Sequence, residues 1–232
     1  MNTTTQRTEQ TLPLAELVGQ VEQPPAPPID LDAVGEQYLR EARLKTAIDR
    51  WHAYCPPKLK TTDWQHDDLV PYAAQHRVVL AWKGGERGIL AAGPTARGKT
   101  RAMWALMKRL SEEGRECRFF TAASFFAALQ SQVSYGRETA FDWLLYLAKI
   151  PILFIDDLGQ EAVQANKMEW AQGWLLQLCD MRVGLGLPLF VTTNISARDM
   201  TEPTQQIRAD PLIRRLLDLC DVVKFWDEEK TR

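Results

Sequence analysis

A glycine-rich stretch at residues 88–100, G-I-L-A-A-G-P-T-A-R-G-K-T, constrains the fold of this chain more than any other part of its sequence. Gly93 and Gly98 lie five residues apart, and Lys99 and Thr100 follow directly. Glycines at this spacing let backbone N–H groups turn inward onto a phosphate. The apolar run before the motif predicts a strand and the segment after it a helix. We therefore interpret the stretch as a phosphate-binding loop (P-loop) and not as a chance glycine turn before a lysine.

The P-loop predicts the residues that bind a nucleotide and its metal ion. Lys99 is expected to reach the outer phosphates, and Thr100 to hold Mg²⁺ through its hydroxyl. The helix that begins there would point its positive end at the phosphates. The expected ligands are ATP and Mg²⁺, and the expected cofactor-binding residues are Gly93, Pro94, Thr95, Ala96, Arg97, Gly98, Lys99 and Thr100.

Charge and hydropathy exclude several classes of protein. The formal net charge of −2 gives no field that would attract a polyanion over the whole surface, so any contact with nucleic acid must be local. The N-terminus, M-N-T-T-T-Q-R-T-E-Q, lacks the apolar core of a signal peptide, and no apolar run approaches the length of a membrane span. We expect a cytoplasmic protein with no membrane partner.

The cysteines indicate reduced thiols and not a disulfide scaffold. Cys55, Cys117, Cys179 and Cys220 are scattered and form no C-x-x-C pair. A zinc site drawn from the cysteine and histidines near residue 60 is an alternative, but its spacing matches no common zinc finger. Its ligands would be His52, Cys55, His66 and His76.

Composition divides the chain into three parts. Residues 1–30 are polar, end in Q-P-P-A-P-P and predict a flexible proline-rich tail. Residues 31–60 predict a helical partner-binding segment, with a helix over 34–53 and a local surplus of positive charge. That surplus fits a docking surface for a protein or DNA, or simply a solvated helix face. Residues 61–232 are the expected ATPase domain.

From residue 88 onward, short apolar segments alternate with helical patterns, which is typical of an α/β fold with a parallel sheet covered on both faces. Five strands are expected, at Gly88–Gly93, Cys117–Thr121, Ile152–Asp156, Pro188–Thr193 and Val222–Trp226.

Polar side chains at the ends of two of these strands add to the expected site. Asp156 and Asp157 follow the apolar run of the third strand, where a carboxylate would face the ligand crevice of such a sheet. Asp156 fits a ligand of Mg²⁺ or its waters, and Asp157 fits a group that orients or deprotonates the attacking water. Asn194 at the tip of the fourth strand can bind a γ-phosphate or its attacking water, or can cap the following helix.

Two further sites are predicted from charge and position. Arg214 and Arg215 lie on a short helix before the last strand, where an arginine fits a contact with the γ-phosphate of an adjacent subunit or a basic surface helix. The segment S-Y-G-R at 134–137 fits a single-stranded DNA contact, in which Tyr135 stacks on a base and Arg137 contacts a phosphate, or a plain surface turn.

The order of G-P-T-A-R-G-K-T, F-I-D-D-L-G, L-P-L-F-V-T-T-N and R-R-L resembles the DnaC/IstB-type AAA+ ATPases, which are bacterial and phage helicase loaders and transposition helpers. The resemblance covers about residues 60–232. It implies a P-loop NTPase of the AAA+ type, with a five-stranded parallel sheet, helices on both faces and no full lid domain. It also implies Arg215 as an arginine finger, ATP-dependent self-assembly, contact with single-stranded DNA, and an N-terminal segment that grips a replicative helicase or a transposase.

The sequence departs from the family pattern at three places. Ala96 stands where the family's loop usually has glycine, which calls the local backbone dihedrals into question. Asp157 stands where most AAA+ proteins have glutamate. Only 17 residues follow Arg215, among them Arg232, a candidate substitute for the usual second sensor.

Four functions are compatible with this sequence. The first is an ATPase of DNA replication that loads a replicative helicase onto single-stranded DNA, and its alternative within the same fold is an IstB-like transposition helper. A small-molecule P-loop phosphotransferase is the third, although neither an arginine-rich lid nor an acceptor pocket is evident. The fourth is a nucleotide-dependent binding module that does not hydrolyse ATP.

Overall fold

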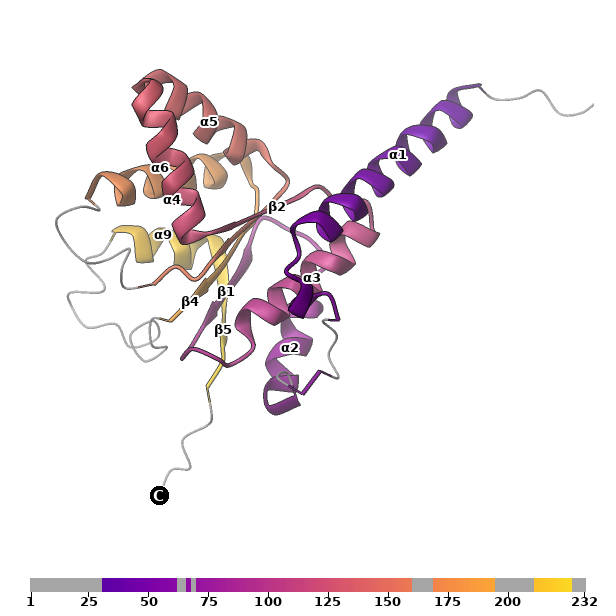
Figure 1. Cartoon of the computed structure of the whole chain (residues 1–232), viewed down its shortest axis with the longest axis horizontal. Coiled ribbons are helices and arrows are strands. Elements are labelled where there is room, and N and C mark those ends of the chain that lie inside the picture. The colour runs from indigo at the N-terminus through magenta and orange to yellow at the C-terminus, as the bar shows by residue number, and fades with distance from the viewer. Residues whose placement is uncertain (1–30, 62–65, 68–69, 160–168, 195–210, 227–232) are drawn as a thin grey trace, which may run out of the picture. The chain divides into compact units, whose positions relative to one another are not determined.

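The fold is built on one parallel sheet of five strands, seen in a computed structural model of the chain (Figure 1). The structure describes residues 31–61, 66–67, 70–159, 169–194 and 211–226. Contacts divide the chain into two compact units, 1–37 and 38–232, and the sheet lies in the second. The predicted divisions after residues 30 and 60 stay predictions.

The strands are arranged in the order β2-β3-β4-β1-β5. All of them pair in parallel, and Leu90 of β1 lies opposite Val191 of β4 on one side and Val222 of β5 on the other. Strand β4 therefore separates the P-loop strand β1 from the acidic strand β3. The strands are β1 (Gly88–Ala92), β2 (Cys117–Thr121), β3 (Ile152–Asp156), β4 (Leu189–Thr193) and β5 (Cys220–Lys224).

The α/β fold and its five parallel strands are confirmed, and the largest shift concerns the last strand. Strand β5 begins at Cys220, two residues before the predicted start, because pairing with β1 runs from Gly88–Cys220 to Ala92–Lys224. It lies at the edge of the sheet, where the exposed Asp221 is tolerated and accepts a hydrogen bond from Arg87 at 2.8 Å. The apolar pattern alone placed this polar residue outside the strand.

Helices cover both faces of the sheet in the second unit (Figure 1). One face packs against α2 (Ala73–Leu80), α3 (Lys99–Glu112) and the part of α1 (Leu31–Tyr54) that belongs to this unit. The other packs against α4 (Ala122–Tyr135), α5 (Arg137–Lys149), α6 (Glu169–Leu185) and α9 (Pro211–Leu219). Two short 3₁₀ turns, η2 (Pro57–Leu59) and η3 (Val70–Tyr72), precede β1.

Each face has its own apolar core, because successive strand residues point to opposite sides. Leu90 belongs to the core beneath α4, α5, α6 and α9, and its neighbour Ile89 to the core beneath α2 and α3. On the α3 side, Trp51 donates from Nε1 to the carbonyl of Trp104 at 3.3 Å, which joins α1 to α3. Burial of each large apolar side chain stabilises the fold by about 1.5–3 kcal/mol.

A buried arginine of α6 joins the end of α5 to the segments that precede β3 and β4. Arg182 of α6 is fully buried, and its guanidinium donates hydrogen bonds to backbone carbonyls at the end of α5 and just before β3 and β4. Burial lowers the pKa of Arg182 to about 10. The carbonyls belong to Leu147, Ala148, Ile150, Pro151 and Pro188.

The four cysteines are free and buried. Burial raises the pKa of Cys117 and of Cys179 to about 12. Within the described residues, no three His, Cys, Asp or Glu side chains lie where they would hold a metal ion, so the structure does not assemble the alternative zinc site at His52, Cys55, His66 and His76. None of the described helices is long and apolar enough to span a membrane.

Candidate active site

The P-loop leaves the carboxyl end of β1 and enters α3 at Lys99. Gly93 has φ +151°, and a Cβ there would lie 2.2 Å from the carbonyl oxygen of Phe225, so that only glycine fits. Gly98 has φ +81° at the N-cap of α3. The first turn of α3 therefore directs its backbone N–H groups and its positive dipole end at the loop.

Ala96 adopts φ +60°, in the left-handed region that alanine seldom occupies. The sequence had called the backbone dihedrals at this position into question, because the family's loop usually has glycine there. The loop thus keeps its conformation at a cost of about 1–2 kcal/mol for the alanine.

Lys99 extends back across the loop and is buried. Its Nζ donates to the carbonyl oxygens of Gly93 at 2.8 Å and Pro94 at 2.6 Å, and to Oδ1 of Asn194 at 3.0 Å. Burial lowers the pKa of Lys99, and the nearby Asp157 and Asp156 oppose that shift. An ammonium has three protons to donate, so a phosphate that binds Lys99 must replace one of these acceptors.

Asp156 ends β3 with a buried carboxylate. Its Oδ1 accepts hydrogen bonds from the hydroxyls of Thr192 at 2.6 Å and Thr100 at 2.9 Å. Burial raises the pKa of Asp156, and these two hydrogen bonds oppose the shift. Because the Thr100 proton points at Asp156, the lone pairs of the Thr100 oxygen are available to a cation. Oxygen donors of this kind fit Mg²⁺.

Asp157 follows with φ +57°, a second left-handed residue that is not glycine. Its Oδ1 accepts a hydrogen bond from Nδ2 of Asn194 at 2.8 Å. The amide of Asn194 therefore contacts Lys99 through its oxygen and Asp157 through its nitrogen.

These side chains surround one cavity of about 460 Å³ at the carboxyl edge of the sheet. Its volume lies in the range of small-molecule sites. It is lined by Lys58, Leu59, Thr95, Ala96, Arg97, Gly98, Lys99, Thr100, Arg101, Asp156, Asp157, Thr192 and Asn194.

Sequence reasoning missed several of these lining residues. Lys58 and Leu59 belong to η2, which Arg101 ties to α3 through a hydrogen bond of 3.2 Å to the carbonyl of Lys58. Lys58, Leu59 and Arg101 belong to no sequence motif. Arg97, which the P-loop motif did predict, donates to the hydroxyl of Tyr72 in η3 at 2.5 Å. The position of Thr192, two residues before Asn194 on a buried strand, predicts that its hydroxyl lies at the same edge of the sheet, but it does not predict which groups the hydroxyl contacts.

The structure does not bring Arg215 to this cavity. Arg215 lies on α9, with a side chain 45% exposed, and its Nε is 2.5 Å from Oδ1 of Asp180 on α6. Asp218 on its own helix lies 3.5 Å from Nη1. Arg214 beside it is exposed. An action of Arg215 on a nucleotide in a neighbouring subunit stays a prediction.

The predicted DNA segment forms the junction between α4 and α5, where Gly136 separates Tyr135 from Arg137. Tyr135 is 78% exposed, as a base-stacking side chain must be. The contact of this turn with single-stranded DNA stays a prediction.

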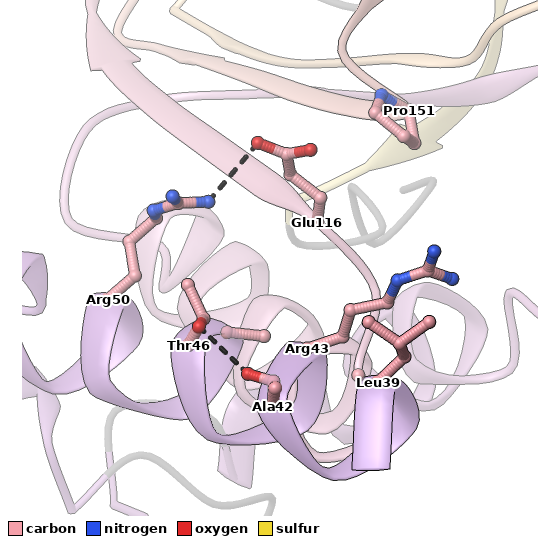
Figure 2. A pocket seen from close by; sticks show the side chains of 9 residues that line it. Leu39, Ala42, Arg43, Thr46, Arg50, Glu116 and Pro151 are labelled. Atoms are coloured by element: carbon pink, nitrogen blue, oxygen red, sulfur yellow. Dashed lines mark hydrogen bonds and ion pairs between the residues drawn. The ribbon is translucent and has the colours of Figure 1, made fainter. Parts of the chain in front are cut away.

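A second cavity, of about 620 Å³, lies beside α1 within the second unit (Figure 2). Figure 2 shows Arg50 reaching from α1 to Glu116, and the two side chains form an ion pair of 3.2 Å. Arg43 and Leu39 extend from the same helix. The walls are formed by Leu39, Ala42, Arg43, Thr46, Ala47, Arg50, Gly114, Glu116 and Pro151.

Solved structures resemble this fold at low sequence identity. The DnaC helicase loader is 18% identical with a TM-score of 0.56, covering 72% of this chain and 96% of that chain. DnaI is 20% identical with a TM-score of 0.52, covering 75% and 93%. AMPPCP-bound DnaA from Aquifex aeolicus is 16% identical with a TM-score of 0.56, and this chain spans only 53% of it. The shared fold is that of P-loop AAA+ proteins.

The sequence itself was compared with curated proteins and with protein families. No curated protein matches it. The family described as IstB-like ATP binding protein matches residues 36–231, which include the P-loop, both acids of β3 and Asn194. This chain therefore belongs to the IstB-like ATP-binding protein family, within the DnaC/IstB-type AAA+ ATPases.

Proposed function

We propose that this protein hydrolyses ATP and couples the ATP cycle to loading a replicative helicase onto single-stranded DNA. The observation that carries the proposal is the hydrogen-bonded chain from Lys99 through Asn194 to Asp157, beside the pair formed by Thr100 and Asp156. The residues proposed to bind phosphate, to hold the metal ion and to orient the attacking water thus line one cavity.

Each group has a role in the proposed hydrolysis. Lys99 and the loop N–H groups bind the β- and γ-phosphates. Thr100 and Asp156 would hold Mg²⁺, which neutralises charge on the phosphates. Asp157, held by Asn194, orients the attacking water or accepts its proton. Arg215 of a neighbouring subunit stabilises the charge that develops on the γ-phosphoryl group.

Assembly and DNA contact complete the proposal. Subunits that pack head to tail, each offering Arg215 to the next, would form an open spiral or a ring. Single-stranded DNA would contact Tyr135 and Arg137 at the turn between α4 and α5. A Tyr135→Ala/Arg137→Ala double variant tests this, because DNA binding that survives at several salt concentrations would place the contact elsewhere.

A second candidate function is that of a transposition helper, and the family match to IstB-like proteins favours it. The solved structures of the DnaC helicase loader and of DnaI share this fold. This likeness supports the first candidate by analogy alone. The two candidates differ in the client that residues 31–60 would grip. In the described part of that segment, Arg43 and Leu39 at the cavity of Figure 2 are available for such a contact.

One experiment separates the candidates. Phosphate release by the full chain is measured with ATP and Mg²⁺, with and without single-stranded DNA, and with a purified replicative helicase or transposase. Stimulation by DNA and helicase supports the proposal, and stimulation by transposase supports the alternative. ATP binding without phosphate release in any mixture would indicate a binding module, and ADP formation only with a small-molecule acceptor would indicate a phosphotransferase.

A further inference from the structure

Thr192 contacts both acids of the candidate active site. It lies near the end of β4 and is 2% exposed. Its Oγ1 is 2.6 Å from Oδ1 of Asp156 and 2.8 Å from the backbone nitrogen of Asp157. One hydroxyl therefore bridges a side chain and a main-chain group of consecutive residues on the neighbouring strand.

The direction of these two hydrogen bonds follows from the groups involved. The Asp157 N–H can only donate, so the Thr192 oxygen accepts from it. The single proton of the hydroxyl is then left for the carboxylate of Asp156. Thr100 donates to the same Oδ1, and Oδ2 of Asp156 accepts no hydrogen bond from the described residues. The bridge thus fixes which carboxylate oxygen remains available.

The same strand end also holds the backbone after Asp156. The Leu158 N–H donates to the carbonyl of Thr192 at 2.8 Å, and the Thr193 hydroxyl donates to the carbonyl of Leu158 at 2.6 Å. Asp157, whose own N–H is held by Thr192, directly precedes Leu158 at φ +57°, which costs about 1–2 kcal/mol for a residue with a Cβ. Contacts from β4 therefore hold a backbone conformation that the segment would otherwise leave.

We propose that Thr192 is a positioning residue, whose hydroxyl sets the rotamer of Asp156 toward the metal ion and the backbone of Asp157 toward the attacking water. This inference rests on the proposed ATP hydrolysis and adds a residue outside the P-loop and the acid pair. Threonine suits the role because its hydroxyl both accepts and donates while its methyl group fills the buried strand.

Thr192→Val keeps the shape of the side chain and removes both hydrogen bonds. We expect its kcat to fall at least about tenfold, equal to about 1.4 kcal/mol in the barrier. We also expect the Mg²⁺ concentration that half-saturates the tightening of fluorescent ATP-analogue binding to rise several-fold. Affinity for the analogue in EDTA should stay within about twofold of wild type, because Lys99 and the loop are untouched. Thr192→Ser keeps the hydroxyl and should restore kcat and the Mg²⁺ midpoint.

Thr193→Val is the matched control. It removes a buried hydroxyl from the next position of β4, one that donates to a backbone carbonyl and not to an acid. We expect it to lower the temperature of thermal unfolding without moving the Mg²⁺ midpoint. If Thr192→Val unfolds, Thr192→Ala takes its place, since it removes the hydroxyl without placing a methyl group against the carboxylate.

Two results would overturn the inference: a Mg²⁺ midpoint and kcat unchanged in Thr192→Val, or a Thr192→Ser variant as defective as Thr192→Val. Failure of the proposed function looks different, because wild type itself would then release no phosphate. In that case the Mg²⁺ midpoint for analogue binding still tests the position of Asp156.

Discussion

Lys99 donates a hydrogen bond from Nζ to the side-chain oxygen of Asn194 over 3.0 Å, although 95 residues separate the two in the sequence. The other end of the same amide holds Asp157. The group expected to bind the γ-phosphate is therefore two hydrogen bonds from the acid expected to orient the water. A nucleotide that draws Lys99 away from Asn194 would also free the amide oxygen, so that phosphate binding and the position of Asp157 are physically linked.

The first prediction concerns the lysine. Lys99→Ala removes the cation whose Nζ lies among Gly93, Pro94 and Asn194, and we expect the affinity for ATP to fall at least about tenfold, or about 1.4 kcal/mol. Titration with a fluorescent ATP analogue measures the loss. Lys58→Ala is the matched control, because Lys58 lines the same cavity from η2 but is exposed, and its affinity should stay within about twofold. Equal affinities for wild type and Lys99→Ala would remove the P-loop assignment.

The second prediction concerns stability and pH. Because burial raises the pKa of Asp156, the ionised carboxylate costs folding free energy. Folding favours the protonated form of Asp156. The stability that this side chain contributes is therefore complete below the pKa of the unfolded chain, about 3.9, and is lost as pH rises through the raised pKa of the folded protein. Without nucleotide at neutral pH, Asp156→Asn should therefore be more stable by about 1 kcal/mol, and Mg²⁺-dependent hydrolysis should disappear.

Thermal unfolding of both proteins from pH 7 downward measures this difference. The advantage of Asp156→Asn should shrink as the pH falls and wild-type Asp156 takes up a proton. A variant less stable than wild type at neutral pH would contradict the assignment of burial as the cause.

Sequence patterns predicted the sheet well because each strand carries its own local signal. Four apolar residues before Asp156 predict β3, and the motif after Gly88 predicts β1. Neither prediction depends on which strands lie alongside. The predicted start of β5 was two residues late, because Asp221 is tolerated at a sheet edge and the sequence does not show which strand lies at that edge.

The site could be predicted where a motif encodes it and not where the register of the sheet creates it. The spacing of the motif predicts the roles of Lys99 and Thr100, and the departure from glycine at Ala96 pointed to the unusual backbone dihedrals there. The link from Thr192 to Asp157 spans 35 residues and depends on how β3 and β4 align. A threonine in a strand is so common that its sequence alone gives no sign of that contact.

The third prediction concerns Arg182, a buried cation whose described hydrogen-bond partners are carbonyl groups and not acids. Arg182→Met leaves buried acceptors at the end of α5 and the starts of β3 and β4 without a donor, and we expect a loss of about 2–4 kcal/mol in the free energy of unfolding. Arg182→Lys should lose less, since an ammonium can donate but cannot match the planar fork. Denaturant unfolding measures both.

Arg40→Met is the control for Arg182. Arg40 is exposed on α1, so the same substitution there should change the free energy of unfolding by less than about 0.5 kcal/mol. Similar values for the two methionine variants would mean that the hydrogen bonds of Arg182 only offset the cost of burying its charge.

The last prediction concerns Arg215. Among the described residues, the arginines that line the cavity are Arg97 and Arg101, and both donate hydrogen bonds to η3 and η2. We therefore expect the arginine that assists Lys99 at the γ-phosphoryl group to come from a neighbouring subunit. Arg215 is half-exposed, and its ion pair with Asp180 is worth at most about 1 kcal/mol at such a surface, too little to prevent exchange for a phosphate.

If a neighbouring subunit supplies Arg215, hydrolysis should rise faster than linearly with protein concentration. Arg215→Ala should bind ATP almost normally and hydrolyse it about 10³-fold more slowly, whereas Arg214→Ala, its exposed neighbour, should retain most activity. Mixing Arg215→Ala with Asp157→Asn should restore part of the activity, because some interfaces then pair an intact cavity with an intact arginine. Phosphate release from the mixture decides the matter: if both variants bind ATP and assemble but their mixture stays as inactive as either alone, Arg215 does not act across a subunit interface.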